Sequence, residues 1–407
     1  MRVTTNLIFD RNYRAINENQ GQLSDIQTQL ASGKKLLRPS DDPVGASQVI
    51  RLTEELNKIT QYNRNNDLVA SSLELQETTL RSMNDVVNRA RVLTVQAGNG
   101  ILSSADKKAL GAEIEQLRNQ TIDLMNTQNA SGEYIFAGYQ SATQAFEFNP
   151  TATENRIQFV GDDGTNEIQL SDSVSIQSTT SGKTLFEDVR ARLNFDIVNE
   201  SGLTVDAFQI KNQGTFDQFH NNNFDPAVPA NNQFRFDIIE VDQIQVTNIG
   251  TGTVVDSLPF ESGELFSFNG AEFTISGTIG DSMDINLNRP QKTNLAETLH
   301  NMFLALNDDS LDQQSFTNLI DDTLVGLDNG LNKMARENSS IGARLNIAQS
   351  VKNSQLDAEI ANEQARSSIE DVDYAKASAE FSKQETALEA AFASFPRVAN
   401  LSLFNYI

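Results

Sequence analysis

Side chains able to carry out acid–base, nucleophilic or metal chemistry are scarce in this sequence. The only two histidines are His220 and His300, and there is no cysteine. The lack of cysteine excludes disulfides, thiolate metal sites and cysteine nucleophiles, and neither histidine belongs to a His-Glu-x-x-His zinc motif. His220 lies in an asparagine-rich segment, so we predict a solvent-exposed side chain on a loop. These residues predict no catalytic site, and we expect a protein that is not an enzyme.

Acidic side chains are abundant, but their spacing predicts no metal or cofactor site. Residues 161–164 (GDDG) lack the ligand spacing of a calcium-binding loop, so we predict a tight turn there. No glycine-rich phosphate-binding loop occurs. The formal net charge of −24 is opposite to the basic surface that nucleic acids require. We therefore expect no cofactor, no metal and no nucleic-acid partner.

Apolar residues occur in stripes rather than in long runs. There is no run of about 18 consecutive apolar residues, the length that a membrane-spanning helix requires. Residues 1–10 (MRVTTNLIFD) lack the apolar core of a secretory signal. We expect no membrane insertion and no cleaved signal peptide.

Two long stretches are free to form helices because proline is absent from 44–149 and from 291–395. Apolar residues recur at steps of three and four over 44–97 and 312–366, the spacing of a helix that buries one stripe against a partner. At a rise of 1.5 Å per residue, each of these helices would be about 80 Å long. We predict that they pack as antiparallel neighbours in a long helical rod.

The limits and faces of these helices also have sequence signals. Residues 39–43 (PSDDP) offer capping side chains before a proline in the first turn of the first long helix. In the second long helix we assign Ile341, Ala348 and Leu356 to the buried stripe.

The composition changes between the helical arms. Most of the 23 phenylalanines lie within 136–273. Apolar and polar residues alternate in 233–238, as in strands with one buried face, and Asn269-Gly270 between two alternating runs is a hairpin signal. The Asn- and Gln-rich stretch 211–232 predicts a loop. The fold class that we predict is mainly α with an inserted β-rich domain.

Both ends of the chain carry apolar residues at heptad spacing, which predicts terminal coiled-coil helices. The last residues are strongly apolar, and an apolar end normally requires a partner. We predict that the two ends pair with each other and with neighbouring subunits. The residues predicted at this assembly interface are Tyr13, Ile16, Leu23, Leu30, Leu37, Leu388, Phe392, Phe395, Leu401, Leu403 and Phe404.

Several stretches in both arms are similar to motifs of the flagellin superfamily. They are 30–36 (LASGKKL) followed by 39–45 (PSDDPVG), 92–100 (VLTVQAGNG), 339–346 (SSIGARLN) and 368–375 (SIEDVDYA). The chain is therefore identified as a member of that superfamily.

Three further stretches resemble the hook-associated protein 3 branch of the superfamily more than filament flagellin. They are 1–6 (MRVTTN), 39–43 (PSDDP) and 132–138 (GEYIFAG), and the ending 404–407 (FNYI) departs from the usual flagellin terminus.

The proline distribution, the change in composition and the heptad spacing at both ends predict a division of the chain into five parts. An amino-terminal coiled-coil arm (1–37) pairs with a carboxy-terminal arm (368–407). The rod is formed by 38–135 and 291–367, and the β-rich outer domain by 136–290.

The resemblance implies a structural adapter of the bacterial flagellum that joins the hook to the filament. Its expected partners are the first hook-associated protein, flagellin and copies of itself in a ring. An export chaperone is expected to bind the carboxy-terminal helix. The expected location is extracellular, after export by the flagellar type III apparatus.

Three other functions compete with this one. The first is filament flagellin itself. The second is a secreted adhesin or enzyme carried in the middle domain, and the third is a cytosolic coiled-coil scaffold, which would leave the motifs at both ends unexplained.

Overall fold

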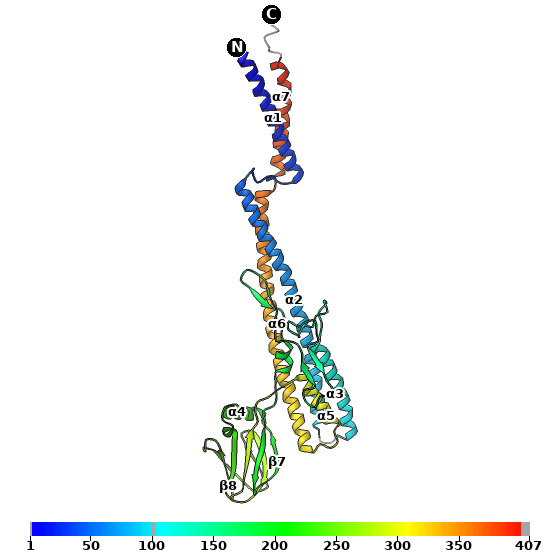
Figure 1. The fold of residues 1–407 in the computed structure, drawn as a ribbon, viewed down its shortest axis with the longest axis vertical. Coiled ribbons are helices and arrows are strands. Elements are labelled where there is room, and N and C mark those ends of the chain that lie inside the picture. The colour runs from blue at the N-terminus through cyan, green and yellow to red at the C-terminus, as the bar shows by residue number, and fades with distance from the viewer. Residues whose placement is uncertain (1, 100–101, 400–407) are drawn as a thin grey trace. The chain divides into compact units, whose positions relative to one another are not determined.

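The computed structural model describes residues 2–99 and 102–399. They divide into two compact units. Unit 1 comprises the described residues within 1–68, 169–175 and 347–407, and unit 2 comprises those within 69–168 and 176–346. The helices are α1 (Arg2–Ser32), α2 (Pro43–Ala97), α3 (Ser104–Met125), α4 (Gln213–Asn223), α5 (Leu295–Asn307), α6 (Gln313–Glu370) and α7 (Tyr374–Ala399) (Figure 1).

Fourteen strands lie between the helical arms. They are β1 (Phe146–Phe148), β2 (Ile157–Phe159), β3 (Glu167–Gln169), β4 (Ser175–Gln177), β5 (Val189–Arg190), β6 (Phe195–Ser201), β7 (Thr204–Ile210), β8 (Gln233–Glu240), β9 (Gln243–Asn248), β10 (Val254–Pro259), β11 (Leu265–Phe268), β12 (Ala271–Ser276), β13 (Ser282–Leu287) and β14 (Lys292–Thr293). Helices at both ends of the chain thus flank a β-rich middle, and the predicted fold class is confirmed.

The two long helices match the predicted extents to within four residues. α2 has 55 residues, and α6 has 58 and continues to Glu370, beyond the predicted end at 366. Asp42 caps α2, because its Oδ1 accepts a hydrogen bond from Gly45 N at 2.9 Å, and Pro43 occupies the first turn. α2 ends at Ala97, the predicted last residue of this helix. No helix in the described part of the chain combines the length and the apolar character needed to cross a membrane.

In unit 1, the first part of α2 packs antiparallel to the last part of α6. Asn66 Nδ2 donates to the Ala348 carbonyl at 2.8 Å across this interface. The assignment of Leu356 to the buried stripe is wrong, because this side chain is 43% exposed. The heptad steps from Ile341 through Ala348 reach Gln355 instead, which is buried and donates to the Leu170 carbonyl.

In unit 2, α3 packs on α5 through a buried polar pair. Ser103 and Asp106 form a capping box at the start of α3. Arg118 of α3 and His300 of α5 are both buried, and Arg118 Nη1 lies 2.7 Å from His300 Nδ1. The Arg118 guanidinium also stacks over the Phe148 ring at 4.8 Å from its centroid.

The β-rich core is a sandwich of two antiparallel sheets with strand orders β10-β9-β8-β13-β6 and β11-β12-β7. Residues on β8 alternate between buried and partly exposed, as the sequence predicts for this strand. Phe236 of β8 contacts Phe268 and Phe273 of the facing sheet at centroid distances of 5.2 and 5.4 Å. The phenylalanine enrichment of the middle segment is therefore the core of this sandwich.

The predicted hairpin joins β11 and β12. Asn269 has φ +46° and Gly270 has φ +86°, the positive pair that a type I′ turn requires. Gly270 also lies close to α4: an added Cβ would be 2.4 Å from the Asn212 carbonyl oxygen.

The prediction of a loop over 211–232 is wrong, because the segment contains α4. Asn212 Oδ1 caps this helix by accepting a hydrogen bond from Thr215 N. Phe216, Phe219 and His220 form one face of α4 and are buried. His220 is therefore not a solvated loop residue: it is fully buried, and its Nε2 lies 2.8 Å from the Asn288 carbonyl. Burial lowers the pKa of His220.

Candidate assembly interface at the terminal helices

The terminal helices α1 and α7 lie side by side in unit 1 and run in opposite directions (Figure 1). Two hydrogen bonds fix their register. Val372 N donates to the Gly33 carbonyl at 2.9 Å, and farther along the pair Gln384 Nε2 donates to Gln22 Oε1 at 3.1 Å. The helices therefore form an antiparallel two-stranded pair.

The inner surface of this pair follows heptad spacing on both helices. Side chains at alternating steps of three and four are buried or half-buried, as in a coiled-coil seam. On α1 they are Ile16, Asn19, Leu23, Ile26 and Leu30, and on α7 they are Ala377, Phe381, Gln384, Leu388 and Ala391. Asn19 and Gln384 place polar groups in the seam, which fixes register at a cost in stability.

The residues predicted at the assembly interface fall on two different surfaces. Ile16 is buried in the seam, and Leu23, Leu30 and Leu388 are half-buried there. Tyr13 and Phe392 instead point outward, with 56% and 54% of their surfaces exposed. Leu7, which the sequence analysis did not select, is also outward-facing at 61%.

Leu37 does not belong to the heptad to which it was assigned. α1 ends at Ser32, so Leu37 lies beyond the helix and is half-buried in the connection to α2. Leu401, Leu403 and Phe404 lie outside the described residues, and so does the side chain of Phe395.

A joint connects the α1–α7 pair to the rest of unit 1. Both helical arms are interrupted at this joint: the first between α1 and α2, and the second between α6 and α7. Lys34 forms a β-bridge with Asp371 and a salt bridge with Glu370, and Lys35 N donates to the Glu370 carbonyl at 2.7 Å. Gly33 has φ +74°, and a Cβ there would lie 3.1 Å from the Tyr374 hydroxyl. Glycine is favoured at this position because L side chains rarely adopt that backbone conformation.

The same joint starts two new helices. The Asp373 carboxylate accepts hydrogen bonds from the backbone N–H groups of Ala375 and Lys376 and so caps α7. An added Cβ on Gly45, in the first turn of α2, would lie 3.2 Å from the Ile369 side chain. The stretches 30–36, 39–45 and 368–375, each recognised separately in the sequence, are thus parts of one joint. The available signals were Gly33, Pro39 and Pro43 in the first arm and the capping residue Asp373 in the second.

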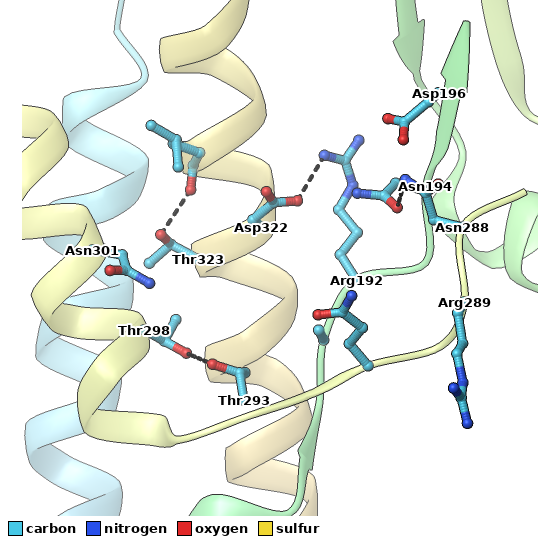
Figure 2. A pocket seen from close by; sticks show the side chains of 13 residues that line it. Arg192, Asn194, Asp196, Asn288, Arg289, Thr293, Thr298, Asn301, Asp322 and Thr323 are labelled. Carbon is cyan, nitrogen blue, oxygen red and sulfur yellow. Dashed lines mark hydrogen bonds and ion pairs between the residues drawn. The ribbon is translucent and has the colours of Figure 1, made fainter. Parts of the chain in front are cut away.

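The described part of unit 2 contains a polar hollow of about 420 Å³. Figure 2 shows its lining, in which amide and hydroxyl side chains surround Arg192. Arg192 Nη1 lies 3.1 Å from Asp322 Oδ1 on α6, and Arg192 Nε donates to Gln213 Oε1 at 2.8 Å. Burial raises the pKa of Asp322, while Arg192 opposes this rise. Through these contacts Arg192, which lies in the connection between β5 and β6, links this connection to α4 and α6.

Arg192→Ala should therefore destabilise unit 2. Removing the buried guanidinium leaves the Asp322 carboxylate without its cation, and we expect a loss of about 2 kcal/mol in the free energy of unfolding. The measurement is urea unfolding of the full chain. Arg289→Ala is the control, since this exposed arginine lines the same hollow. Equal effects of the two substitutions would contradict this linking role of Arg192.

Comparison with known families accounts for both helical arms. Residues 3–141 match the family model described as the bacterial flagellin N-terminal helical region. Residues 324–407 match the bacterial flagellin C-terminal helical region.

Curated relatives include flagellar hook-associated proteins and flagellins. The chain is 30% identical over 189 residues to flagellar hook-associated protein 3 of Escherichia coli, covering 46% of this chain and 58% of the relative. The protein of the same name from Salmonella typhimurium is 31% identical over 147 residues, covering 36% and 46%. A flagellin of Listeria innocua is 28% identical over 145 residues, covering 36% and 50%. The chain thus spans about half the length of the curated relatives it matches.

Solved structures share the fold at lower identity. Flagellar hook-associated protein 3 of Legionella pneumophila has a TM-score of 0.59 at 22% identity, covering 79% of this chain and 99% of that one. FlgL of Xanthomonas campestris has a TM-score of 0.57 at 21% identity, covering 78% and 99%. With matches to both the amino-terminal and the carboxy-terminal region of flagellins, and with this fold, the chain belongs to the bacterial flagellin family.

Proposed function

We propose that this chain is a structural adapter of the bacterial flagellum that joins the hook to the filament. The observation that carries the proposal is the α1–α7 pair. The two segments that match flagellin regions at the ends of the chain fold against each other, yet Leu7, Tyr13 and Phe392 remain exposed. Its curated relatives named hook-associated protein 3 support the junction role in particular.

Assembly would bury these outward-facing side chains against neighbouring subunits. Removing apolar surface from water is the main favourable term in protein association, and a paired-helix surface can repeat this contact around a ring. In this arrangement the arms 1–37 and 368–407 form the inner layer, and the β-rich 136–290 faces outward. The partners are the first hook-associated protein, flagellin and further copies of the chain, with an export chaperone on the carboxy-terminal helix.

The proposed location is outside the cell, after type III export without cleavage of a signal. The role is mechanical, and no reaction is assigned to the chain.

Filament flagellin is the second candidate, favoured by the match to the flagellin of Listeria innocua. Deleting the gene separates the two functions, with electron microscopy of the cells and an immunoblot for flagellin in the medium. A junction adapter predicts bare hooks and flagellin lost to the medium, because exported flagellin finds no template. A filament subunit predicts bare hooks with no other flagellin detected. Normal filaments would refute both.

Limited proteolysis offers a separate prediction on the free chain. The α1–α7 pair is held mainly by half-buried side chains and has two amide side chains in its seam, so its local stability should be low. We expect trypsin and chymotrypsin to cut within 1–37 and 368–407 before they cut the β-sandwich. Mass spectrometry of the fragments locates the cuts. Full protection of both ends in dilute solution would contradict the prediction.

A further inference from the structure

Unit 2 carries a concentration of positive charge that contrasts with the formal net charge of −24 for the chain. Arg190 on β5, Lys292 on β14, and Lys333 and Arg336 on α6 surround a single carboxylate, Asp188. We call these four cations and Asp188 the basic cluster. Four positive charges against one negative charge leave it with a local excess of three.

The strand pair in the basic cluster holds like charges directly opposite each other. Arg190 and Lys292 are Cα partners in the antiparallel ladder of β5 and β14. Like charges in directly opposed positions of a ladder are destabilising. Lys292 Nζ lies 2.9 Å from Asp188 Oδ1, so the one carboxylate is already paired with this lysine.

The two cations on α6 donate hydrogen bonds to backbone carbonyl groups, which do not neutralise their charges. Lys333 Nζ donates to the Asp188 backbone carbonyl at 2.8 Å, which supplies a hydrogen bond but no full negative charge. Arg336 Nε donates to the Asn332 carbonyl of its own helix. Burial lowers the pKa of Lys333, and Lys292, Arg336 and Arg190 lower it further, against the opposing effect of Asp188.

Asp188 and three of the four cations, Arg190, Lys333 and Arg336, line a hollow of about 730 Å³, in which Asp188 is the one acidic residue among the described lining residues. Asn329, Asn332 and Ser339 add neutral hydrogen-bonding groups to the same lining. Among the described residues, neither Arg190 nor Arg336 has an ion-pair partner. Two guanidinium groups, one ammonium group and neutral donors therefore face one hollow, whose lining carries a net positive charge.

We propose that the basic cluster is a binding site for a multiply charged oxyanion, such as a phosphate or sulfate group. A multiply charged ion is favoured over a monovalent one because the local excess is three charges. An oxyanion is favoured over a halide because each guanidinium presents two parallel N–H donors to two oxygens of one group. This site lies outside the terminal helices and does not depend on the proposed role in assembly.

Isothermal titration of the full chain tests the proposal with sodium phosphate against sodium chloride at equal ionic strength. We expect phosphate to bind saturably and chloride to give no saturable binding. Arg336→Gln should weaken phosphate binding by about tenfold or more, because it removes a bidentate donor. Lys292→Gln provides a second variant on another element, with the same expected direction.

The matched control is Arg64→Gln, which removes one positive charge from an exposed position of α2 in unit 1. It should bind phosphate as the unsubstituted chain does. Phosphate binding no stronger than that of chloride, or equal losses in Arg336→Gln and Arg64→Gln, would overturn the proposal. Thermal unfolding of each variant in chloride checks that the fold is unchanged.

A second titration with glucose 6-phosphate distinguishes the source of the anion. Tighter binding than inorganic phosphate would identify a sugar-linked phosphate as the preferred form of the ligand. Equal affinity would identify the free ion, and both results support an oxyanion site. If neither compound binds, the proposal is wrong.

Discussion

Leu388→Asp is expected to prevent incorporation of the chain into flagella while leaving unit 2 folded. Leu388 lies on the inner surface of α7, half-buried against α1. The substitution removes apolar contact and places a charged carboxylate in the seam, at a cost of about 2–3 kcal/mol. The α1–α7 pair has few fully buried side chains to compensate for such a loss.

The measurement is complementation of a deletion strain, with an immunoblot of sheared flagella for the incorporated chain. We expect incorporation to fall to about one-tenth or less, since 1.4 kcal/mol already corresponds to tenfold. Ala387→Asp is the control: it adds the same charge to the neighbouring exposed position of the same helix. Unfolding of purified Leu388→Asp, followed by circular dichroism, should retain the transition of the β-sandwich. Normal incorporation of Leu388→Asp would contradict the role of the seam in assembly.

The elements that the sequence predicted best are those with a long repeat or a strong local signal. α2 and α6 extend over tens of residues without proline, so the helical spacing of their apolar residues repeats many times. The hairpin at Asn269-Gly270 depends on two residues with positive φ, a requirement that few sequences meet. In both cases short-range physics determines the structure.

The elements that were missed depend on contacts between distant segments. α4 has a polar composition, and only the sandwich core that receives Phe216 and Phe219 identifies its apolar face. Leu37 is seven residues after Leu30 and so fits the heptad spacing of α1, but the helix ends at Ser32, before the joint with 368–375. The joint itself pairs Lys34 with Asp371, which are separated by most of the chain.

The residues predicted at the assembly interface divide between two surfaces for the same reason. The heptad spacing selected Ile16, Leu23, Leu30 and Leu388, but a one-dimensional pattern does not distinguish a seam within the chain from a surface between chains. The structure assigns these four to the seam. Among the predicted residues whose side chains the structure describes, Tyr13 and Phe392 are the ones on the exposed surface of the helices.

Acidification should destabilise unit 2 through His300. The Arg118 guanidinium can only donate, so His300 Nδ1 accepts its hydrogen bond and the neutral ring carries its proton on Nε2. Protonating Nδ1 would remove this acceptor and bring two cations together in a buried site. Burial first, and then Arg118 and Arg156, lower the pKa of His300 from 6.5 to about 4.

The direction of the effect follows from the two pKa values. Between pH 6.5 and about 4, the unfolded chain binds a proton at His300 and the folded chain does not. The free energy of unfolding therefore falls as the pH is lowered through this range, by about 3 kcal/mol in total. Above pH 6.5 the histidine is neutral in both states, and its contribution is constant.

The difference between two chains isolates this contribution from that of the carboxylates. In His300→Gln the amide oxygen can still accept the Arg118 hydrogen bond, but the side chain does not titrate. Urea unfolding at intervals from pH 7 to pH 4 should therefore show a smaller loss of stability in the variant.

His220→Gln is the matched control, since burial also lowers the pKa of His220, which has no arginine partner among its described hydrogen bonds. We expect the His220 effect to have the same sign and a smaller size, because no cation is held against its ring. Parallel curves for the unsubstituted chain and His300→Gln would show that the Arg118–His300 pair does not set the acid sensitivity of unit 2.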